Sequence, residues 1–387
     1  MLTDEHRLLR DSLREFSQQR LAPFAAEWDR NATFPKAALA ELAALGTFGI
    51  AVPDHYGGAG MDYLALAIAL EEIAAGDGAT STIISVNNCP VCSILMAWAT
   101  EEQKQRYLVP LARGEMLGAF CLTEPHVGSE ASGLRTTARR EGDFYVLDGV
   151  KQFITSGKHG DVAIVMAVTD RSAGKRGISA FIVETSTPGY VVARLEEKMG
   201  QHASDTAQIL LENCRVPAAN LIGDEGAGYK IALSGLEGGR IGIASQSLGM
   251  ARAAYEAALK YARERVAFGK PIYEHQAVQF RLADMATALE AARQLIHHAA
   301  RLKDSGLPCL REAAMAKLFA SEMAERVCSD AIQVHGGYGY VADFPVERIY
   351  RDVRVCQIYE GTSDIQRILI ARNLKRHGSQ APGENER

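Results

Sequence analysis

Apolar residues recur at near-helical spacing along residues 8–45, which predicts amphipathic helices there. Residues 62–75 form a strongly apolar segment that begins at Asp62, a candidate helix cap. Residues 99–114 form a charged amphipathic segment with Thr100 as its candidate cap. We therefore predict an N-terminal helical domain over residues 1–118. The apolar positions of its first helices are Leu8, Leu9, Leu13, Phe16, Leu21, Leu39, Leu42 and Leu45.

The pattern changes over residues 119–228, where short β-prone runs are separated by Gly, Pro, Asp and Asn. Gly142-Asp143 and Asp148-Gly149 are typical of turns, and the second predicts a hairpin over residues 148–157. The runs lie too close together for crossover helices, which favours a small antiparallel barrel or sandwich over a parallel sheet. The runs are 144–147, 161–166, 178–183 and 208–211.

Helical periodicity returns after residue 228 and predicts four long helices. Because short connections join them, we expect a four-helix bundle over residues 229–376, followed by a disordered tail over 377–387. The fold class is therefore α+β and mostly α, with a central β-barrel between helical domains and a ligand cleft expected at their junction. The four helices span residues 240–265, 276–303, 310–334 and 364–375.

Composition excludes several classes of function. The formal charge of -5 gives no polyanion-binding footprint, so we expect no nucleic acid partner. We find no apolar run approaching the roughly 18 residues of a bilayer span, and no leader at the N-terminus, so we expect no membrane insertion and a prokaryotic cytoplasmic location. The seven scattered cysteines do not form a disulfide framework. Cys89 and Cys92 have C-x-x-C spacing but lack a second ligand pair, so we expect no metal site.

The common cofactor and nucleophile motifs are also missing from the sequence. Gly226-Ala227-Gly228 lacks the third glycine of a dinucleotide fingerprint, because Ile231 occupies that position. No phosphate-binding loop, zinc-protease helix or nucleophile elbow is present. Any nucleotide cofactor must therefore be held by another arrangement.

Glu360 is the candidate catalytic residue. It follows the apolar positions Val353, Val355 and Ile358 and precedes an amphipathic stretch, so its carboxylate is expected to meet an apolar interior. Burial disfavours the charged form and raises the pKa, which makes a carboxylate a usable base near neutral pH. The alternative is a glutamate that only complements a helix N-terminus capped by Thr362 or Ser363.

Four further runs suit a ligand with phosphates and a planar ring, although each also has an ordinary structural explanation. Residues 121–133 combine Thr123 with a Gly-Ser pair, in a loop that exposes backbone N–H groups or forms a plain turn. Residues 152–157 place an aromatic beside a hydroxyl. Residues 263–272 are a helix end whose Arg265 suits a pyrophosphate, and residues 333–340 are a glycine-rich helix exit.

Taken together, these runs resemble the acyl-CoA dehydrogenases, specifically the short-chain, butyryl-CoA-dehydrogenase-like branch, over about residues 1–376. The resemblance implies non-covalent FAD and a homotetramer built as a dimer of dimers. It implies α,β-dehydrogenation of an acyl-CoA thioester to the trans-2-enoyl-CoA, in which Glu360 abstracts the α-proton and the β-hydride passes to flavin N5. Electrons would then pass to an electron-transfer flavoprotein. The acyl chain length stays open.

The resemblance also implies roles for individual positions. Glu360 resembles the catalytic base, Ser129 a position shared by FAD phosphate and acyl-CoA, and Glu237, Arg240 and Gly361 the substrate-binding positions. The remaining positions resemble FAD contacts, some of them to the FAD of a neighbouring subunit. They are Leu122, Thr123, Phe153, Thr155, Arg265, Phe268, Gln276, Gln333, Gly336, Gly337, Thr362 and Asp364.

Three positions depart from the family pattern. Glu130 stands where the family usually has Asp, and Phe153 replaces a common Trp. Position 239, where some branches place their base, is Gly, so Glu360 has no competitor there. The alternatives are a flavin oxidase or monooxygenase on the same scaffold that uses O₂, a nitroalkane-oxidising relative, and a non-catalytic CoA-binding member.

Overall fold

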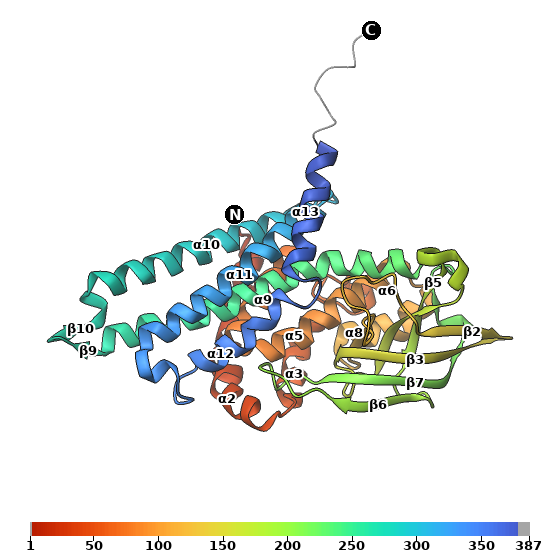
Figure 1. Ribbon diagram of the computed structural model, residues 1–387, viewed down its shortest axis with the longest axis horizontal. Helices are drawn as coiled ribbons and strands as arrows, with labels where there is room; N and C mark the ends of the chain where they lie inside the picture. Colours follow the sequence, from red (N-terminus) through yellow and green to blue (C-terminus); the bar gives the residue numbers. More distant parts are fainter. Residues whose placement is uncertain (1, 378–387) are drawn as a thin grey trace, which may run out of the picture.

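The computed structural model describes residues 2–377 and places a helical N-terminal part beside a central sheet and a long C-terminal helical part (Figure 1). Asp62 caps α4 by accepting from the Ala65 N–H at 2.7 Å, which confirms the predicted helix start. Thr100 forms a capping box with Gln103 at the start of α7, as predicted. The N-terminal helices are α1 Asp4–Phe16, α2 Ala22–Asn31, α3 Lys36–Ala44, α4 Tyr63–Gly76, α5 Gly78–Val86, α6 Ser93–Trp98, α7 Glu101–Gln103 and α8 Val109–Arg113.

One segment contradicts the prediction that no apolar run approaches the length of a bilayer span. Gly78–Trp98 is long and apolar enough by composition, but 83% of its most apolar window is buried inside the protein. It runs from α5 through a π-helical turn, Asn87–Cys92, into α6, with a break at Cys89. The segment is therefore a core element that packs along α9, and both cysteines of the C-x-x-C pair are buried within it.

The central strands form one open sheet, so the predicted closed barrel is not borne out. The order is β6-β7-β3-β2-β4-β5-β8, with β1 parallel to β4, and the end strands β6 and β8 do not pair with each other. β2 and β4 share one registered pair, and Tyr145 on β3 packs on Phe181 on β5 at a ring separation of 4.9 Å. The strands are β1 Gly118–Cys121, β2 Thr137–Glu141, β3 Phe144–Thr155, β4 Val162–Val168, β5 Ile178–Glu184, β6 Tyr190–Leu195, β7 Thr206–Pro217 and β8 Leu221–Ile222.

The hairpin predicted at Asp148-Gly149 is also wrong. β3 runs without a break from Phe144 to Thr155, and its pairing with β7 shifts register between Leu147 and Gly149 and again between Lys151 and Ile154. These irregularities are β-bulges, which bend a strand without ending it. The turn at Gly142-Asp143 is confirmed, because it joins the antiparallel strands β2 and β3 with Gly142 at φ +61°.

The C-terminal part contains the four predicted helices and the shorter α12. α9 begins at Gly228, well before the predicted residue 240, because its glycines pack closely on other elements instead of breaking the helix. α13 packs on α11, and the predicted tail lies outside the described residues except for His377. The elements are α9 Gly228–Glu264, β9 Val266–Ala267, β10 Lys270–Pro271, α10 Gln276–Asp304, α11 Leu310–His335, α12 Val346–Val353 and α13 Ser363–His377.

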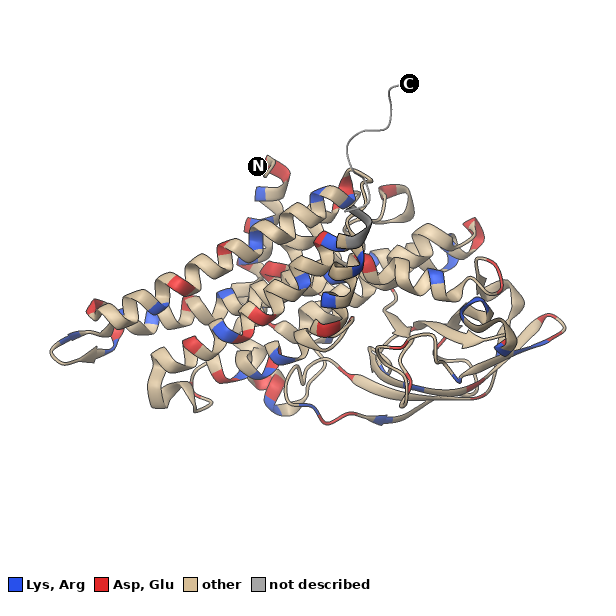
Figure 2. Ribbon diagram, turned by 45° about the horizontal axis from the view of Figure 1, so that its top comes forward, with Lys and Arg blue, Asp and Glu red and all other residues tan. Residues whose placement is uncertain are grey.

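Alanine dominates the interface between the long helices, since the core shared by α9, α10 and α11 contains Ala251, Ala254, Ala258, Ala299 and Ala320. Small side chains let helix backbones approach closely. Lys and Arg are interspersed with Asp and Glu along the helices (Figure 2), so the ribbon in this view has no face of one charge sign.

Candidate active site

Glu360 lies in the short loop between the 3₁₀ turn Arg354–Gln357 and α13, and its side chain reaches across to α9. A Cβ built at Gly239 would overlap Glu360 Oε2, so the carboxylate occupies the space that any other residue at 239 would need. Glu360 itself has φ +50° and Gly361 has φ +93°. Two successive left-handed residues, one of them not glycine, form a strained turn that aims the carboxylate at α9.

The environment of Glu360 makes it a base near neutral pH. Burial raises the pKa of Glu360 to about 7, although the cations Lys317 and Arg240 act in the opposite direction. Its Oε2 atom is buried and has no hydrogen-bond partner among the described residues. An unpaired, desolvated carboxylate oxygen is costly in the folded state and is well suited to accept a proton.

Two residues that the sequence did not single out hold the loop in place. Lys317 on α11 donates from Nζ to the Gly361 carbonyl at 2.8 Å. Gln366 on α13 donates from Nε2 to the same carbonyl at 2.8 Å and to the Glu360 carbonyl at 3.3 Å. The available signal was a lysine between Ala313 and Ala320 on an otherwise apolar helix face.

Arg240, next to Gly239 on α9, is a buried cation with spare donors. It is 4% exposed, and its Nε and Nη1 atoms have no partner among the described residues. Burial lowers the pKa of Arg240, while Glu360 and Glu237 raise it. Glu237 does not pair with it directly but lies 3.4 Å from Lys303 Nζ, at the edge of a cavity of about 420 Å³.

The predicted ring-binding residues come together at the junction of β1 and β3. The Gln152 N–H donates to the Thr123 carbonyl at 2.9 Å, which places the loop that follows β1 against β3. Phe153 is 62% exposed at φ +60°, and Thr155 is half-buried. A fully buried ion pair stiffens this junction, because Lys151 Nζ lies 2.8 Å from Glu124 Oε1.

The other predicted ligand-binding residues near β1 and near Glu360 are exposed or half-buried. Leu122 and Thr123 are half-buried, and Ser129 is exposed in the loop after them. Thr362 accepts from the Ile365 N–H at 3.3 Å and so caps α13, which confirms the capping explanation for Thr362 but leaves Glu360 outside the helix. Asp364 is exposed in the first turn of α13.

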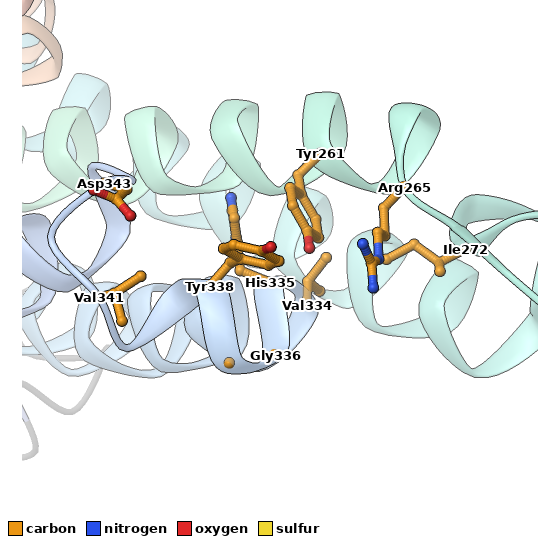
Figure 3. A pocket seen from close by; sticks show the side chains of 10 residues that line it. Tyr261, Arg265, Ile272, Val334, His335, Gly336, Tyr338, Val341 and Asp343 are labelled. Carbon is orange, nitrogen blue, oxygen red and sulfur yellow. The ribbon is translucent and has the colours of Figure 1, made fainter.

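A second group of predicted residues lies around a surface pocket of about 590 Å³ at the end of the long helices (Figure 3). Arg265 lines this pocket together with Gly336 and Gly337, where a Cβ would meet nothing within 4 Å. Phe268, at the tip of the β9–β10 hairpin, is 96% exposed. Gln276 and Gln333 are also exposed on neighbouring helices.

These features fit a long ligand with a planar ring and a charged tail. Open glycine backbone and a guanidinium suit phosphates, and an exposed aromatic beside a hydroxyl suits a ring. The β9–β10 end of the helices and the sheet lie at opposite ends of the molecule (Figure 1). The pocket at Arg265 therefore lies at the end of the helices away from the sheet, which carries Phe153 and Thr155.

Comparison with known proteins identifies the class that this fold and site define. Three family models cover the chain in order: acyl-CoA dehydrogenase N-terminal domain over residues 3–115, middle domain over 119–214 and C-terminal domain over 226–375. The chain belongs to the acyl-CoA dehydrogenase family.

Three relatives show how close the similarity is. The mitochondrial short-chain specific acyl-CoA dehydrogenase of Rattus norvegicus is 47% identical over 97% of this chain and 91% of its own length. The butyryl-CoA dehydrogenase structure from Megasphaera elsdenii has a TM-score of 0.94 at 42% identity, covering 97% of this chain and 99% of that chain. A structure described as the electron transferring flavoprotein of Acidaminococcus fermentans, concerned with flavin-based electron bifurcation, has a TM-score of 0.95 at 46% identity and covers the same shares.

The protein is an FAD-dependent oxidoreductase of this family. The pocket at Arg265, Gly336 and Gly337 and the exposed Phe153 beside Thr155 fit the phosphate and ring ends of that cofactor. When bound, FAD supplies the hydride acceptor, and the chain supplies position and electrostatics.

Proposed function

We propose that this protein dehydrogenates a short-chain acyl-CoA to the trans-2-enoyl-CoA and passes the electrons to an electron-transfer flavoprotein. The observation that carries this proposal is the Glu360 carboxylate, buried against Gly239 with Oε2 unpaired. Relatives named for short-chain and butyryl-CoA substrates support the acyl class, and the relative described with an electron transferring flavoprotein supports the partner.

In the proposed mechanism Glu360 removes the α-proton of the thioester. That proton is weakly acidic, so negative charge that develops on the thioester oxygen needs a fixed donor. We assign this role to the Glu360 backbone N–H, as the resemblance to the family implies. Gly239 admits the carboxylate to the site, and Arg240 lies beside it with free N–H donors for the substrate. Exclusion of water keeps the base desolvated, consistent with its raised pKa.

We assign the other predicted residues to the two ends of FAD and to the substrate. The phosphate-binding group lies at the β9–β10 end of the long helices, whereas the ring-binding group belongs to the sheet (Figure 1). We therefore propose that the FAD site is shared between two copies of the chain, as expected of a homotetramer. Ser129, Glu237, Arg240 and Gly361 are the proposed substrate contacts. The proposed FAD contacts are Leu122, Thr123, Ser129, Phe153, Thr155, Arg265, Phe268, Gln276, Gln333, Gly336, Gly337, Thr362 and Asp364.

The proposal extends to organisation and location. We divide the chain into an N-terminal helical domain over residues 1–118, a β-domain over 119–228 and a helical domain over 229–376. The extent of the three family models supports this division. A cytoplasmic location is the proposed setting for an enzyme that exchanges electrons with an electron-transfer flavoprotein.

An acyl-CoA panel tests the proposed activity. Purified FAD-loaded protein is mixed anaerobically with acyl-CoAs of increasing chain length, and the bleaching of the flavin's visible band is followed. We expect butyryl-CoA to bleach the flavin and an electron-transfer flavoprotein to restore the colour faster than air does. Rapid reoxidation by O₂ alone would indicate an oxidase instead, and no bleaching by any acyl-CoA would indicate a non-catalytic CoA-binding protein.

The pH dependence follows from the raised pKa of Glu360. The base works only when ionised, and burial raises its pKa to about 7, so kcat/KM is expected to fall as pH drops through about 7. A carboxylate with an ordinary pKa would keep its activity down to about pH 4. Initial rates between these limits, with stability checked at each pH, distinguish the two cases.

A further inference from the structure

Lys317 is a fully buried lysine that no step of the proposed mechanism uses. It is 0% exposed on α11, between Ala313 and Ala320 on the helix face that packs into the core. Burying an ammonium group is unfavourable unless specific partners compensate for its lost hydration. Its position therefore calls for a role that an apolar side chain could not fill.

The partners of Lys317 are in the catalytic loop. Its Nζ atom donates to the Gly361 carbonyl at 2.8 Å, the carbonyl directly after the candidate base. Gln366, also fully buried, donates to that carbonyl at the same distance. Two donors from two different helices thus converge on one peptide group, beside a glutamate held at φ +50°.

The charges around this point are few. Four titratable groups face Lys317. They are Glu360 on the loop, Arg240 on α9, Cys356 on the 3₁₀ turn and Glu322 on α11. Burial lowers the pKa of Lys317 to about 8, and burial raises the pKa of Glu360 to about 7. The Lys317 ammonium and the Glu360 carboxylate have opposite charges, so each favours the charged form of the other and the pair is attractive when the base is ionised.

We propose that Lys317 is a positioning residue for the reaction: its ammonium group fixes the Gly361 carbonyl so that Glu360 stays in the left-handed conformation, and its charge favours the carboxylate form. This rests on the proposed function, in which Glu360 is the base. Gln366 supplies a hydrogen bond without a charge, so the two donors can be separated experimentally.

Three variants of the FAD-loaded protein separate charge from hydrogen bonding. Lys317→Met removes both, and we expect bleaching by butyryl-CoA at pH 7 to slow at least about tenfold and its pH midpoint to rise by about one unit. Gln366→Leu removes only a neutral donor, so we expect slower bleaching with an unchanged midpoint. Ser321→Ala, a buried change one turn along α11, should alter neither.

Failure of the positioning role can be told apart from failure of the proposed function. If the wild-type protein does not bleach, the proposed function fails. If it bleaches and Lys317→Met has the wild-type rate and midpoint, the positioning role is wrong. The same holds if Gln366→Leu shifts the midpoint as far as Lys317→Met does. Should Lys317→Met not fold with FAD, Lys317→Arg decides, because a retained cation and donor must keep the wild-type midpoint, and a midpoint raised by about one unit contradicts the role.

Discussion

Glu360→Gln is expected to bind FAD and acyl-CoA normally but to bleach about 10²–10⁴-fold more slowly than the wild-type protein. The amide has nearly the same shape as the carboxylate, so it fits the space at Gly239, but it cannot accept the α-proton. It also removes a desolvated charge whose Oε2 atom has no partner, so the thermal stability of the variant is expected to stay the same or rise. Rapid anaerobic mixing with butyryl-CoA measures the bleaching rate, and thermal unfolding of the same preparation measures stability.

The control for this variant is Glu290→Gln, an exposed glutamate on α10 that ion-pairs with Arg293. Surface ion pairs contribute little, so this change should leave both rate and stability near those of the wild-type protein. Bleaching by Glu360→Gln at the wild-type rate would remove Glu360 from the mechanism and make Glu237, at the edge of the cavity of about 420 Å³, the next candidate for the base.

Gly239→Ala is expected to slow the reaction about 10²-fold, although the added methyl group takes no part in the reaction itself. The added Cβ would overlap Glu360 Oε2, so the carboxylate must move, and small misplacements of a catalytic group have large kinetic costs. Alanine is also the better helix former, so the variant should not lose helical structure in α9. The expected pattern is a folded, FAD-loaded protein with low kcat.

Gly242→Ala is the matched control on the same helix. Its added Cβ would lie 2.7 Å from Ser85 Oγ and would not approach Glu360, so it tests close packing of α9 without touching the base. We expect a change in thermal stability with kcat largely kept. Equal loss of kcat in both variants would mean that Gly239 serves helix packing and not the placement of Glu360.

The sequence predicted the helices and the base better than it predicted the contacts that make the base work. Residues 276–303 and 310–334 were predicted as helices at nearly their observed bounds, because amphipathic periodicity reports burial directly. The run around Glu360 left two interpretations open, a base or a helix-capping glutamate, and the resemblance of runs along the whole chain to the family favoured the base. What local pattern could not show is that Gly239 makes room for it, since these residues lie far apart in the chain and meet only through tertiary packing.

The failures have the same cause. Asp148-Gly149 has the composition of a turn, but pairing with β7 keeps it inside a bulged strand. The predicted start at residue 240 was too late, because Gly235 and Gly238 lie inside α9 and let it pack closely on Pro90 and Cys89. The role of Lys317 could not be predicted, because a lone lysine in a helix is usually solvent-exposed and its burial is visible only in three dimensions.

Deuteration of butyryl-CoA at the α-carbon decides whether Glu360 removes an α-proton. The wild-type protein, mixed anaerobically with this substrate, should bleach severalfold more slowly than with the undeuterated compound. Glu360→Gln should bleach about 10²–10⁴-fold more slowly than the wild-type protein with either compound. A wild-type rate that is insensitive to α-deuteration, or a Glu360→Gln variant that still bleaches at the wild-type rate, would contradict the assignment of Glu360 as the base that acts on an acyl-CoA.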